Sequence, residues 1–335
     1  MKICSNCILP GTFPGISFDD EGVCSHCQNS KSKELKLSED KKKYEQKFLN
    51  LLDQLINQST NQRSYDILIA YSGGKDSTYT ISLLKKKYKL RILALSFDNG
   101  FISETAKVNI KKITEKLDID HIFFNPRWEI LKKIFSIAAA QELYPKKSLE
   151  RASTICTSCM GLVKSICLKF AIEQLIPMIG FGWSPGQAPV QSSIMKTNPS
   201  LIRMSQQAIL NPLKEVIGNE IELYFLQDKH FTASERFPYN IHPMAWEFYN
   251  EDMVLDEIQK LGWVSPKDTD SNSSNCLLNA FSNEIHMQRY GFHPYVWEIA
   301  NMVRDRGMTR EDGYRKIYQE QSADLVNRAR EKLGI

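Results

Sequence analysis

A short apolar run that stops abruptly at two glycines constrains this chain more than any other feature. Residues 65–71 read Tyr-Asp-Ile-Leu-Ile-Ala-Tyr, residues 72–78 read Ser-Gly-Gly-Lys-Asp-Ser-Thr, and residues 77–88 have helical character. A continuous apolar run of this length predicts a buried strand of a parallel sheet. The glycine pair lets the chain turn tightly and brings backbone N–H groups, with the positive end of the following helix, close to an anion. The sequence therefore predicts a strand, an anion-binding loop and a helix in this order.

Three more apolar runs extend this unit into a sheet. Residues 91–97, 121–125 and 177–183 fit further strands, and residues 104–117 fit a helix between the first two. Strands that alternate with helices imply right-handed crossovers. They predict an α/β fold, with a Rossmann-like parallel sheet that carries helices on both faces. After about residue 215 the helical pattern dominates.

The chain divides into four predicted parts. Residues 1–30 are rich in Cys, Gly and Pro and predict a small, loop-dominated module. Residues 31–63 are strongly charged, with apolar positions at helical spacing, and predict a linking helix. Residues 64–230 hold the strands and the anion-binding loop, and residues 231–335 form a helical C-terminal region.

The overall composition is that of a globular protein. The chain has 335 residues, of which 42% are hydrophobic and 24% are charged, and this is enough for a substantial core. Its net charge of +4 neither requires nor excludes a nucleic-acid partner. Because no stretch approaches the roughly 20 apolar residues that span a bilayer, and the N-terminus lacks an apolar signal-peptide core, we expect a cytoplasmic protein without a membrane partner. The oligomeric state stays open, with a homodimer as one option.

The side chains of the loop suit a chain of phosphates. Lys75 can neutralise charge and Asp76 can help to hold Mg²⁺. An ordinary turn with a helix cap is the alternative, but the seven-residue motif directly after a buried strand is a more specific signal than such a turn. The motif also differs from the longer G-x-x-x-x-G-K-[ST] loop of enzymes that cleave the γ-phosphate. Asp98 and Asn99 end the next strand and border the expected ligand crevice, although Asn99-Gly100 also suits a structural turn. Hydroxyl donors to phosphate oxygens are Ser72, Ser77 and Thr78.

The loop also carries a family signature. Ser72, Gly73, Gly74, Asp76 and Ser77 match S-G-G-x-D-S residue for residue, and the chain therefore resembles the PP-loop ATP pyrophosphatase superfamily. The resemblance implies a fold of the adenine nucleotide α-hydrolase type, with ATP as a substrate. It further implies that a carbonyl or amide oxygen is adenylated, that pyrophosphate leaves, and that a nitrogen or sulfur nucleophile displaces AMP. In this interpretation Lys75 and Asp76 are catalytic, and the nucleotide is bound by Ser72, Gly73, Gly74, Asp76, Ser77, Thr78 and Asp98.

Two C-x-x-C pairs lie in the N-terminal module. Cys4 and Cys7 are followed after sixteen intervening residues by Cys24 and Cys27. This spacing is typical of a zinc site with four thiolate ligands. A closed shell of four thiolates leaves no position for a substrate, so the sequence predicts a structural Zn²⁺ in a zinc-ribbon-like module that folds around its metal.

A second set of cysteines lies in the body of the chain. Cys156 and Cys159 form another C-x-x-C pair at the start of a probable helix, and Cys276 is the remaining cysteine that can join them. Cys167, by contrast, lies on an apolar helical face and predicts a buried core residue. The set of three can hold an iron–sulfur cluster with one open iron, a zinc ion, or a redox-active thiol pair, and simple burial is the remaining alternative.

The three cysteines resemble those of the tRNA thiolation branch of the PP-loop superfamily. There, a C-x-x-C pair and one distant cysteine hold a [4Fe-4S] cluster whose free iron can carry an extra sulfur. Residues 211–215 (Asn-Pro-Leu-Lys-Glu) and 220–221 (Glu-Ile) also resemble a stretch of that branch. The resemblance implies sulfur transfer to tRNA or a small molecule from a sulfur donor, with catalytic roles for Cys156 and Cys159 and a cluster held by Cys156, Cys159 and Cys276.

Both ends of the chain resemble a different PP-loop group, the N-acetyl sugar amidotransferases. The similarity lies in residues 4–27, from Cys-Ser-Asn-Cys-Ile-Leu-Pro-Gly to Cys-Ser-His-Cys, and in residues 306–313, Arg-Gly-Met-Thr-Arg-Glu-Asp-Gly. It implies that an acetamido group of a sugar becomes an amidine, with ammonia from a partner glutaminase. A non-catalytic nucleotide-binding adaptor is a third hypothesis. The sequence leaves the acceptor and the nucleophile open.

Overall fold

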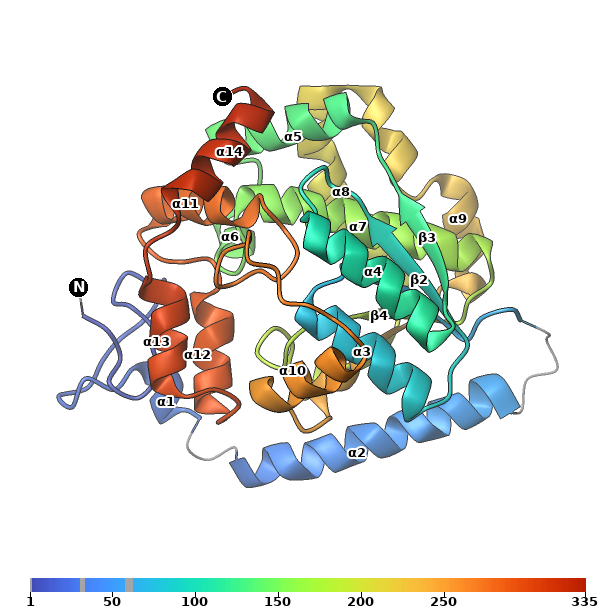
Figure 1. Cartoon of the computed structure of the whole chain (residues 1–335), viewed down its shortest axis with the longest axis horizontal. Helices are drawn as coiled ribbons and strands as arrows, with labels where there is room; N and C mark the ends of the chain where they lie inside the picture. The colour runs from blue at the N-terminus through green and yellow to red at the C-terminus, as the bar shows by residue number, and fades with distance from the viewer. Residues whose placement is uncertain (1, 31–33, 58–62) are drawn as a thin grey trace.

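The computed structural model describes residues 2–30, 34–57 and 63–335, and a six-stranded sheet lies at its centre (Figure 1). The strand order is β3-β2-β1-β4-β6-β5, and only the pair β5–β6 is antiparallel. The predicted Rossmann-like α/β sheet is therefore confirmed. The strands are β1 Ile67–Ala70, β2 Ile92–Phe97, β3 Asp120–Phe124, β4 Met178–Phe181, β5 Ile194–Lys196 and β6 Tyr239–Ile241.

Helices surround this sheet and form the C-terminal part. The α-helices are α1 Ser25–Gln28, α2 Glu34–Leu52, α3 Lys75–Lys86, α4 Glu104–Leu117, α5 Trp128–Ala140, α6 Lys146–Leu149, α7 Thr154–Glu173, α8 Pro199–Ile217, α9 Asp228–Thr232, α10 Glu251–Lys260, α11 Asn279–Tyr290, α12 Val296–Arg304, α13 Arg310–Tyr318 and α14 Ala323–Leu333. A π-helical turn, Asp53–Asn57, extends α2. Short 3-10 turns are Val190–Ser192, Asn219–Tyr224, Ser234–Arg236 and Pro243–Ala245.

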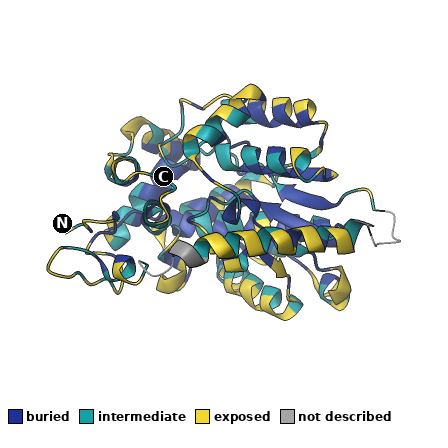
Figure 2. Ribbon diagram, turned by 90° about the horizontal axis from the view of Figure 1, so that it is seen from below, coloured by how far each residue is buried: buried dark blue, intermediate teal, exposed yellow. Residues whose placement is uncertain are grey.

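The two faces of the sheet bury alternate side chains of the same strands. Leu68 of β1 packs into one core cluster with α5, α7 and α8, while Ile67 and Ile69 pack into a second cluster with α3, α4 and α10. The long helix α2 joins the second cluster through Phe48, which is fully buried. Successive side chains of a strand point to opposite faces, and this period of two produces the division. Figure 2 shows the strands buried between helices that expose their outer sides.

The connection between strands defines where a ligand crevice opens. From the central strand β1, the chain continues on one side through β2 and β3, and then crosses to the other side as β4. The carboxyl ends of β1 and β4 therefore form the switch point of the sheet. In open α/β sheets ligands bind at this position, and the loop that begins at Ser72 leaves β1 there.

Two strands were not anticipated from the sequence. β5 and β6 have three residues each, and β6 interrupts the region in which the helical pattern dominates. Strands this short carry too few residues to show a hydrophobic period. β6 pairs with β4 and lies beyond the predicted boundary at residue 230, and that boundary stays a prediction. The predicted linker 31–63 is helical over α2, while its residues 31–33 and 58–62 lie outside the described residues.

One expectation about membranes needs correction. Helix α7 is long and apolar enough to span a bilayer by length and composition, contrary to the expectation that no such stretch exists. Half of its apolar window is buried inside the protein. α7 packs against β1, β4, α5 and α8. A helix that is covered on several sides is apolar nearly all round because it belongs to the core.

Candidate functional site

The loop after β1 is shaped by close backbone packing. Gly73 has a φ of 75°, and a Cβ atom there would lie 2.7 Å from both the carbonyl oxygen of Ala106 and a side-chain carbon of Ile110. Only glycine fits this position without strain. Gly74 is the N-cap residue of α3, so the helix begins at Lys75 with its N–H groups toward the loop. The predicted strand–loop–helix unit is present.

The loop after β4 packs against residues 72–78, the predicted anion-binding loop, which is called the phosphate loop below. A Cβ atom on Gly182 would lie 2.4 Å from the Cα atom of Ser77, so these two backbones are in contact. The hydroxyls of Ser72 and Ser77 lie 3.0 Å apart. Two of the predicted nucleotide ligands, Ser72 and Ser77, thus lie together at the switch point between β1 and β4.

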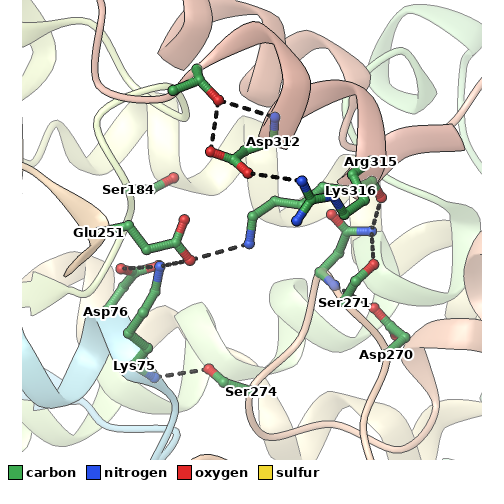
Figure 3. A network of polar contacts seen from close by, with 12 residues as sticks. Lys75, Asp76, Ser184, Glu251, Asp270, Ser271, Ser274, Asp312, Arg315 and Lys316 are labelled. Carbon is green, nitrogen blue, oxygen red and sulfur yellow. Dashed lines mark hydrogen bonds and ion pairs between the residues drawn. The ribbon is translucent and has the colours of Figure 1, made fainter. Parts of the chain in front are cut away.

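Lys75 and Asp76 belong to a network of charges with α10 (Figure 3). The Nζ atom of Lys75 lies 2.8 Å from Oε1 of Glu251 and 3.0 Å from the hydroxyl of Tyr249. Tyr249 donates a hydrogen bond of 3.0 Å to Asp76. Burial acts to lower the pKa of Lys75, but Asp76, Tyr249 and Glu251 outweigh burial and raise it. Lys75 therefore carries a positive charge at the N-terminus of α3.

A distant segment closes the loop. The hydroxyl of Ser274 accepts a hydrogen bond of 2.8 Å from the backbone N–H of Lys75, the first residue of α3. The indole of Trp263 donates to the carbonyl oxygen of Gly73 at 2.9 Å. Cys276 follows two residues after Ser274 and forms an isolated antiparallel bridge with Ile102. The segment that bears Cys276 is thus tied directly to the phosphate loop.

Two of the three cysteines of the body of the chain meet just after the end of β2, and the third contacts α11. The amide nitrogen of Asn99 lies 3.7 Å from the sulfur of Cys159 and 3.5 Å from the sulfur of Cys276. The sulfur of Cys156 lies 3.2 Å from the hydroxyl of Ser282. Burial raises the pKa of all three thiols, that of Cys276 to about 12. Thiolates at this position require a positive partner. The role of these three cysteines stays a prediction.

The four N-terminal cysteines have the geometry of a metal site. Their sulfur atoms all lie within 4.8 Å of one another, and their side chains are fully buried. The sulfurs of Cys4 and Cys27 are 3.9 Å apart, and those of Cys7 and Cys24 are 3.8 Å apart. A tetrahedron with zinc–sulfur bonds of about 2.3 Å has edges of about 3.8 Å. The four thiols therefore fit one tetrahedral metal ion.

The module is held by the last helices of the chain. Arg310 donates to the carbonyl oxygen of Cys7 at 2.9 Å and to that of Cys4 at 3.0 Å. The hydroxyl of Tyr318 donates to Ile8 at 2.7 Å, and Arg304 donates to the sulfur of Cys7 at 3.3 Å. The four N-terminal cysteines belong to one hydrophobic core cluster with residues of α12 and α13. The N-terminal module, α12 and α13 consequently form one unit, visible at the lower left of Figure 1.

Several residues at the site carry no local sequence signal. Glu251 and Tyr249 lie at and just before α10, and Glu298 lies on α12. The hydroxyl of Ser184 donates to Glu298 at 2.5 Å. Burial, with a smaller effect of Asp76, raises the pKa of Glu298 to about 7, against the hydrogen bond from Ser184. In the sequence, a single acid on an amphipathic helix cannot be told from an acid of the solvated face. Only its position in the folded protein distinguishes the two.

Asp98, a predicted nucleotide ligand, lies beside the site in a turn. Its carboxylate accepts a hydrogen bond of 2.8 Å from the backbone N–H of Gly100. Gly100 has a φ of 81°, and a Cβ atom on it would overlap Trp128. Asn99 thus contributes to a structural turn as well as to the cysteine site. The roles of Asp98 and of the other predicted site residues stay predictions.

Relatives of the chain are distant in sequence, and no family model matches it. The uncharacterized protein MJ1599 of Methanocaldococcus jannaschii is 21% identical over 323 residues, which cover 94% of this chain and 92% of that protein. The uncharacterized protein MJ1016 of the same organism is 24% identical over 273 residues, which cover 75% of this chain and 83% of that protein. A glutamine-hydrolyzing GMP synthase of Pyrobaculum aerophilum is 29% identical over 77 residues, 23% of this chain and 15% of that protein. The last similarity is local.

Two solved structures show a loose likeness to this fold. The U34-tRNA thiolase NcsA from Methanococcus maripaludis, solved with its [4Fe-4S] cluster, has a TM-score of 0.40 and 15% identity, over 100% of this chain and 89% of that chain. NMN synthetase from Francisella tularensis has a TM-score of 0.38 and 13% identity, over 88% of this chain and 96% of that chain. Likeness at this level says nothing about the substrate.

The chain's own architecture defines its class. A mostly parallel sheet, a glycine-paired loop at the carboxyl end of its central strand, clustered N-terminal cysteines and a helical C-terminal region form a Rossmann-like α/β fold. This agrees with the resemblance carried by Ser72–Thr78.

Proposed function

We propose that the protein is an adenylating enzyme that cleaves ATP between the α- and β-phosphates. The observation that carries this proposal is the position of Ser72, Lys75, Asp76 and Ser77 at the switch point of the sheet, around the N-terminus of α3. Backbone N–H groups, a lysine and an acidic residue at a helix N-terminus suit a magnesium-bound triphosphate.

The proposed reaction has two steps. A carbonyl or amide oxygen of the acceptor attacks the α-phosphorus, the bond from this phosphorus to the bridging oxygen breaks, and pyrophosphate leaves. A nucleophile then attacks the activated carbon, and AMP departs with the former acceptor oxygen. Lys75 stabilises the charge that develops on the phosphates, while Asp76 helps to hold the Mg²⁺ that screens them.

The test is ATP binding followed by product analysis. Wild-type protein should bind ATP in isothermal titration calorimetry, and a double variant, Asp76→Ala with Ser77→Ala, should lose most of this affinity. Asp256→Ala is the matched control, because this acid lies on the exposed side of α10. With an acceptor, the products should be AMP and pyrophosphate. Wild-type protein that fails to bind ATP would refute the proposal.

For the second step we propose a sulfur nucleophile, with a tRNA or small-molecule acceptor. The support is the convergence of Cys156, Cys159 and Cys276 on the segment that closes the phosphate loop. A [4Fe-4S] cluster held by these three sulfurs would supply an iron that carries the incoming sulfur. Protein purified without oxygen should contain iron and sulfide and be brown. Cys156→Ala and Cys276→Ala should lose the colour, while Cys167→Ala on the same helix α7 should keep it.

An N-acetyl sugar amidotransferase is the second candidate. The two terminal segments that resemble that group pack together, since Arg310 binds the carbonyl oxygens of Cys4 and Cys7. The local likeness to a glutamine-hydrolyzing GMP synthase points in the same direction. In this case the protein should be colourless, and it should depend on ammonia or on a glutaminase partner. Iron and sulfide analysis separates the two candidates.

We further propose that the four N-terminal cysteines hold zinc. Their spacing of 3.8 and 3.9 Å suits a closed tetrahedral shell, which points to a structural role. Metal analysis of the purified protein should find one equivalent of zinc in both candidates.

A further inference from the structure

A second lysine reaches the phosphate site from the end of the chain. Lys316 lies on α13, and its Nζ atom is 3.1 Å from Oε1 of Glu251. The Nζ atom of Lys75 is 2.8 Å from the same oxygen. Figure 3 shows Lys316 extending toward Glu251, Lys75 and Asp76 from the opposite side. Two amines from distant elements therefore share one carboxylate oxygen.

The spacing of the two amines suits a pyrophosphate group. Through their common partner on Glu251, the nitrogens of Lys75 and Lys316 are at most about 6 Å apart. Charge-assisted hydrogen bonds of about 2.7–2.9 Å allow both to contact one pyrophosphate. Burial acts to raise the pKa of Glu251, but the two lysines outweigh burial and lower it. Glu251 is thus an anion that occupies the two amines.

The position of Lys316 is set by contacts on both sides of the site. Its carbonyl oxygen accepts a hydrogen bond of 2.8 Å from Asn272. Asn272 belongs to the segment whose Ser274 binds the backbone N–H of Lys75. Arg310, which begins α13, holds the N-terminal module. α13 is therefore attached to the phosphate loop and to the four cysteines at once.

We propose that Lys316 is a second cation of the phosphate site and binds the pyrophosphate end of ATP together with Lys75. Glu251 holds both amines in place and gives up at least one of them when the triphosphate enters. The inference rests on the proposed ATP cleavage, and adds to it a cation supplied by α13. If Lys316 and Glu251 only formed an ion pair that joins α13 to α10, substitution of Lys316 would lower stability without changing the affinity for phosphate ligands.

The test compares ligands that differ in their phosphates. ATP, AMP and inorganic pyrophosphate are titrated by calorimetry, with Mg²⁺, into full-length wild type, Lys316→Met, Lys316→Arg and the control Arg315→Met. Arg315 is the neighbouring residue on α13 and pairs with Asp312 at 3.6 Å. We expect Lys316→Met to weaken ATP and pyrophosphate binding by about 10-fold or more, the value of one charge-assisted hydrogen bond. AMP affinity should stay within about 2-fold, Lys316→Arg should recover part of the loss, and Arg315→Met should match the wild type.

A second variant, expected to strengthen binding, keeps the test decisive if Lys316→Met fails to fold. Glu251→Gln keeps the shape of the side chain but removes the competing charge, so pyrophosphate should bind about 3- to 10-fold more tightly. The inference is wrong if wild type binds ATP and pyrophosphate while Lys316→Met binds both equally well, or if Glu251→Gln weakens pyrophosphate binding. Wild type that binds neither ligand overturns the proposed function as well.

Discussion

The two sets of cysteines differ in how they are assembled. Cys4, Cys7, Cys24 and Cys27 come from one short segment, are fully buried, and have sulfurs within 4.8 Å of one another. Cys156, Cys159 and Cys276 come from α7 and from a loop far along the chain, and they are partly exposed. In that set the side-chain amide of Asn99 contacts two of the sulfurs. Ser274, two residues before Cys276, accepts a hydrogen bond from the phosphate loop.

We propose that this difference separates a folding element from a reactive site. A closed tetrahedral shell offers no position to a substrate, and its free energy of metal binding goes into folding. An open set of three thiols beside a ligand crevice can exchange what it binds. The short N-terminal module also contributes to the site, because α12 and α13 rest on it and carry Glu298 and Lys316.

The largest effect is expected when the closed set is broken. Cys7→Ala removes one of four ligands and the acceptor of the Arg304 hydrogen bond. Since structural zinc sites contribute about 10–16 kcal/mol in isolated modules, we expect the free energy of unfolding to fall by several kcal/mol. Metal analysis and chemical denaturation measure the loss. Full retention of metal and of stability would remove the distinction between the two sets.

A smaller effect is expected at Glu298, a buried acid on a helix that packs against the closed set of cysteines. Glu298 lies on α12, whose end contacts Cys7 through Arg304, and its pKa is raised from 4.5 to about 7 mainly by burial. Because the folded-state pKa exceeds the unfolded one, wild type loses stability as the pH rises from 4.5 to about 7. Glu298→Gln keeps the partner of Ser184 and avoids this loss, so it should be more stable than wild type by about 2 kcal/mol at pH 8.

Thermal unfolding at pH 5 and pH 8 measures this difference. The advantage of Glu298→Gln should shrink at pH 5, where the wild-type carboxyl is protonated in the folded protein. An equal advantage at both pH values would mean that packing, rather than charge, separates the variant from wild type. Glu257→Gln is the control, since this acid lies on α10 and pairs with the exposed Lys260.

The smallest effect is expected when the open set is broken. Cys159→Ala removes the sulfur of a partly buried residue and leaves the amide of Asn99 with Cys276 as a partner. We expect the free energy of unfolding to fall by only about 1 kcal/mol, because a small side chain at the edge of the core is lost. Denaturant unfolding of the metal-free protein isolates this effect from cluster binding. A loss as large as that of Cys7→Ala would show that the open set also drives folding.

Local signals made much of the fold predictable. Helix α4 has the predicted bounds, since Ser103 caps its first turn by accepting a hydrogen bond from Ala106, and Asp118 ends it in the left-handed conformation. Apolar runs bounded by turn residues identified four strands within a residue or two. β5 and β6 were not predicted because three residues are too few to show a hydrophobic period. Their pairing also depends on strands elsewhere in the chain.

Parts of the site were not predictable from the sequence. Tyr249, Glu251, Glu298 and Lys316 are single polar residues in a helical region rich in charge, where most such side chains face solvent. Asn99 was assigned to the crevice or to a turn, and it takes part in both the turn and the cysteine site. No spacing rule relates any of these residues to Lys75.

The sequence by itself determined the strand–loop–helix unit at Ser72–Thr78 and the four-cysteine module. Each depends on residues a few positions apart, whose backbone preferences and spacing act locally. Only the tertiary structure decided that Ser274 would reach the phosphate loop, that Cys276 would meet Asn99, and that Lys316 would share Glu251 with Lys75. Such meetings follow from how helices pack on the sheet and on the module, and packing depends on the whole chain at once.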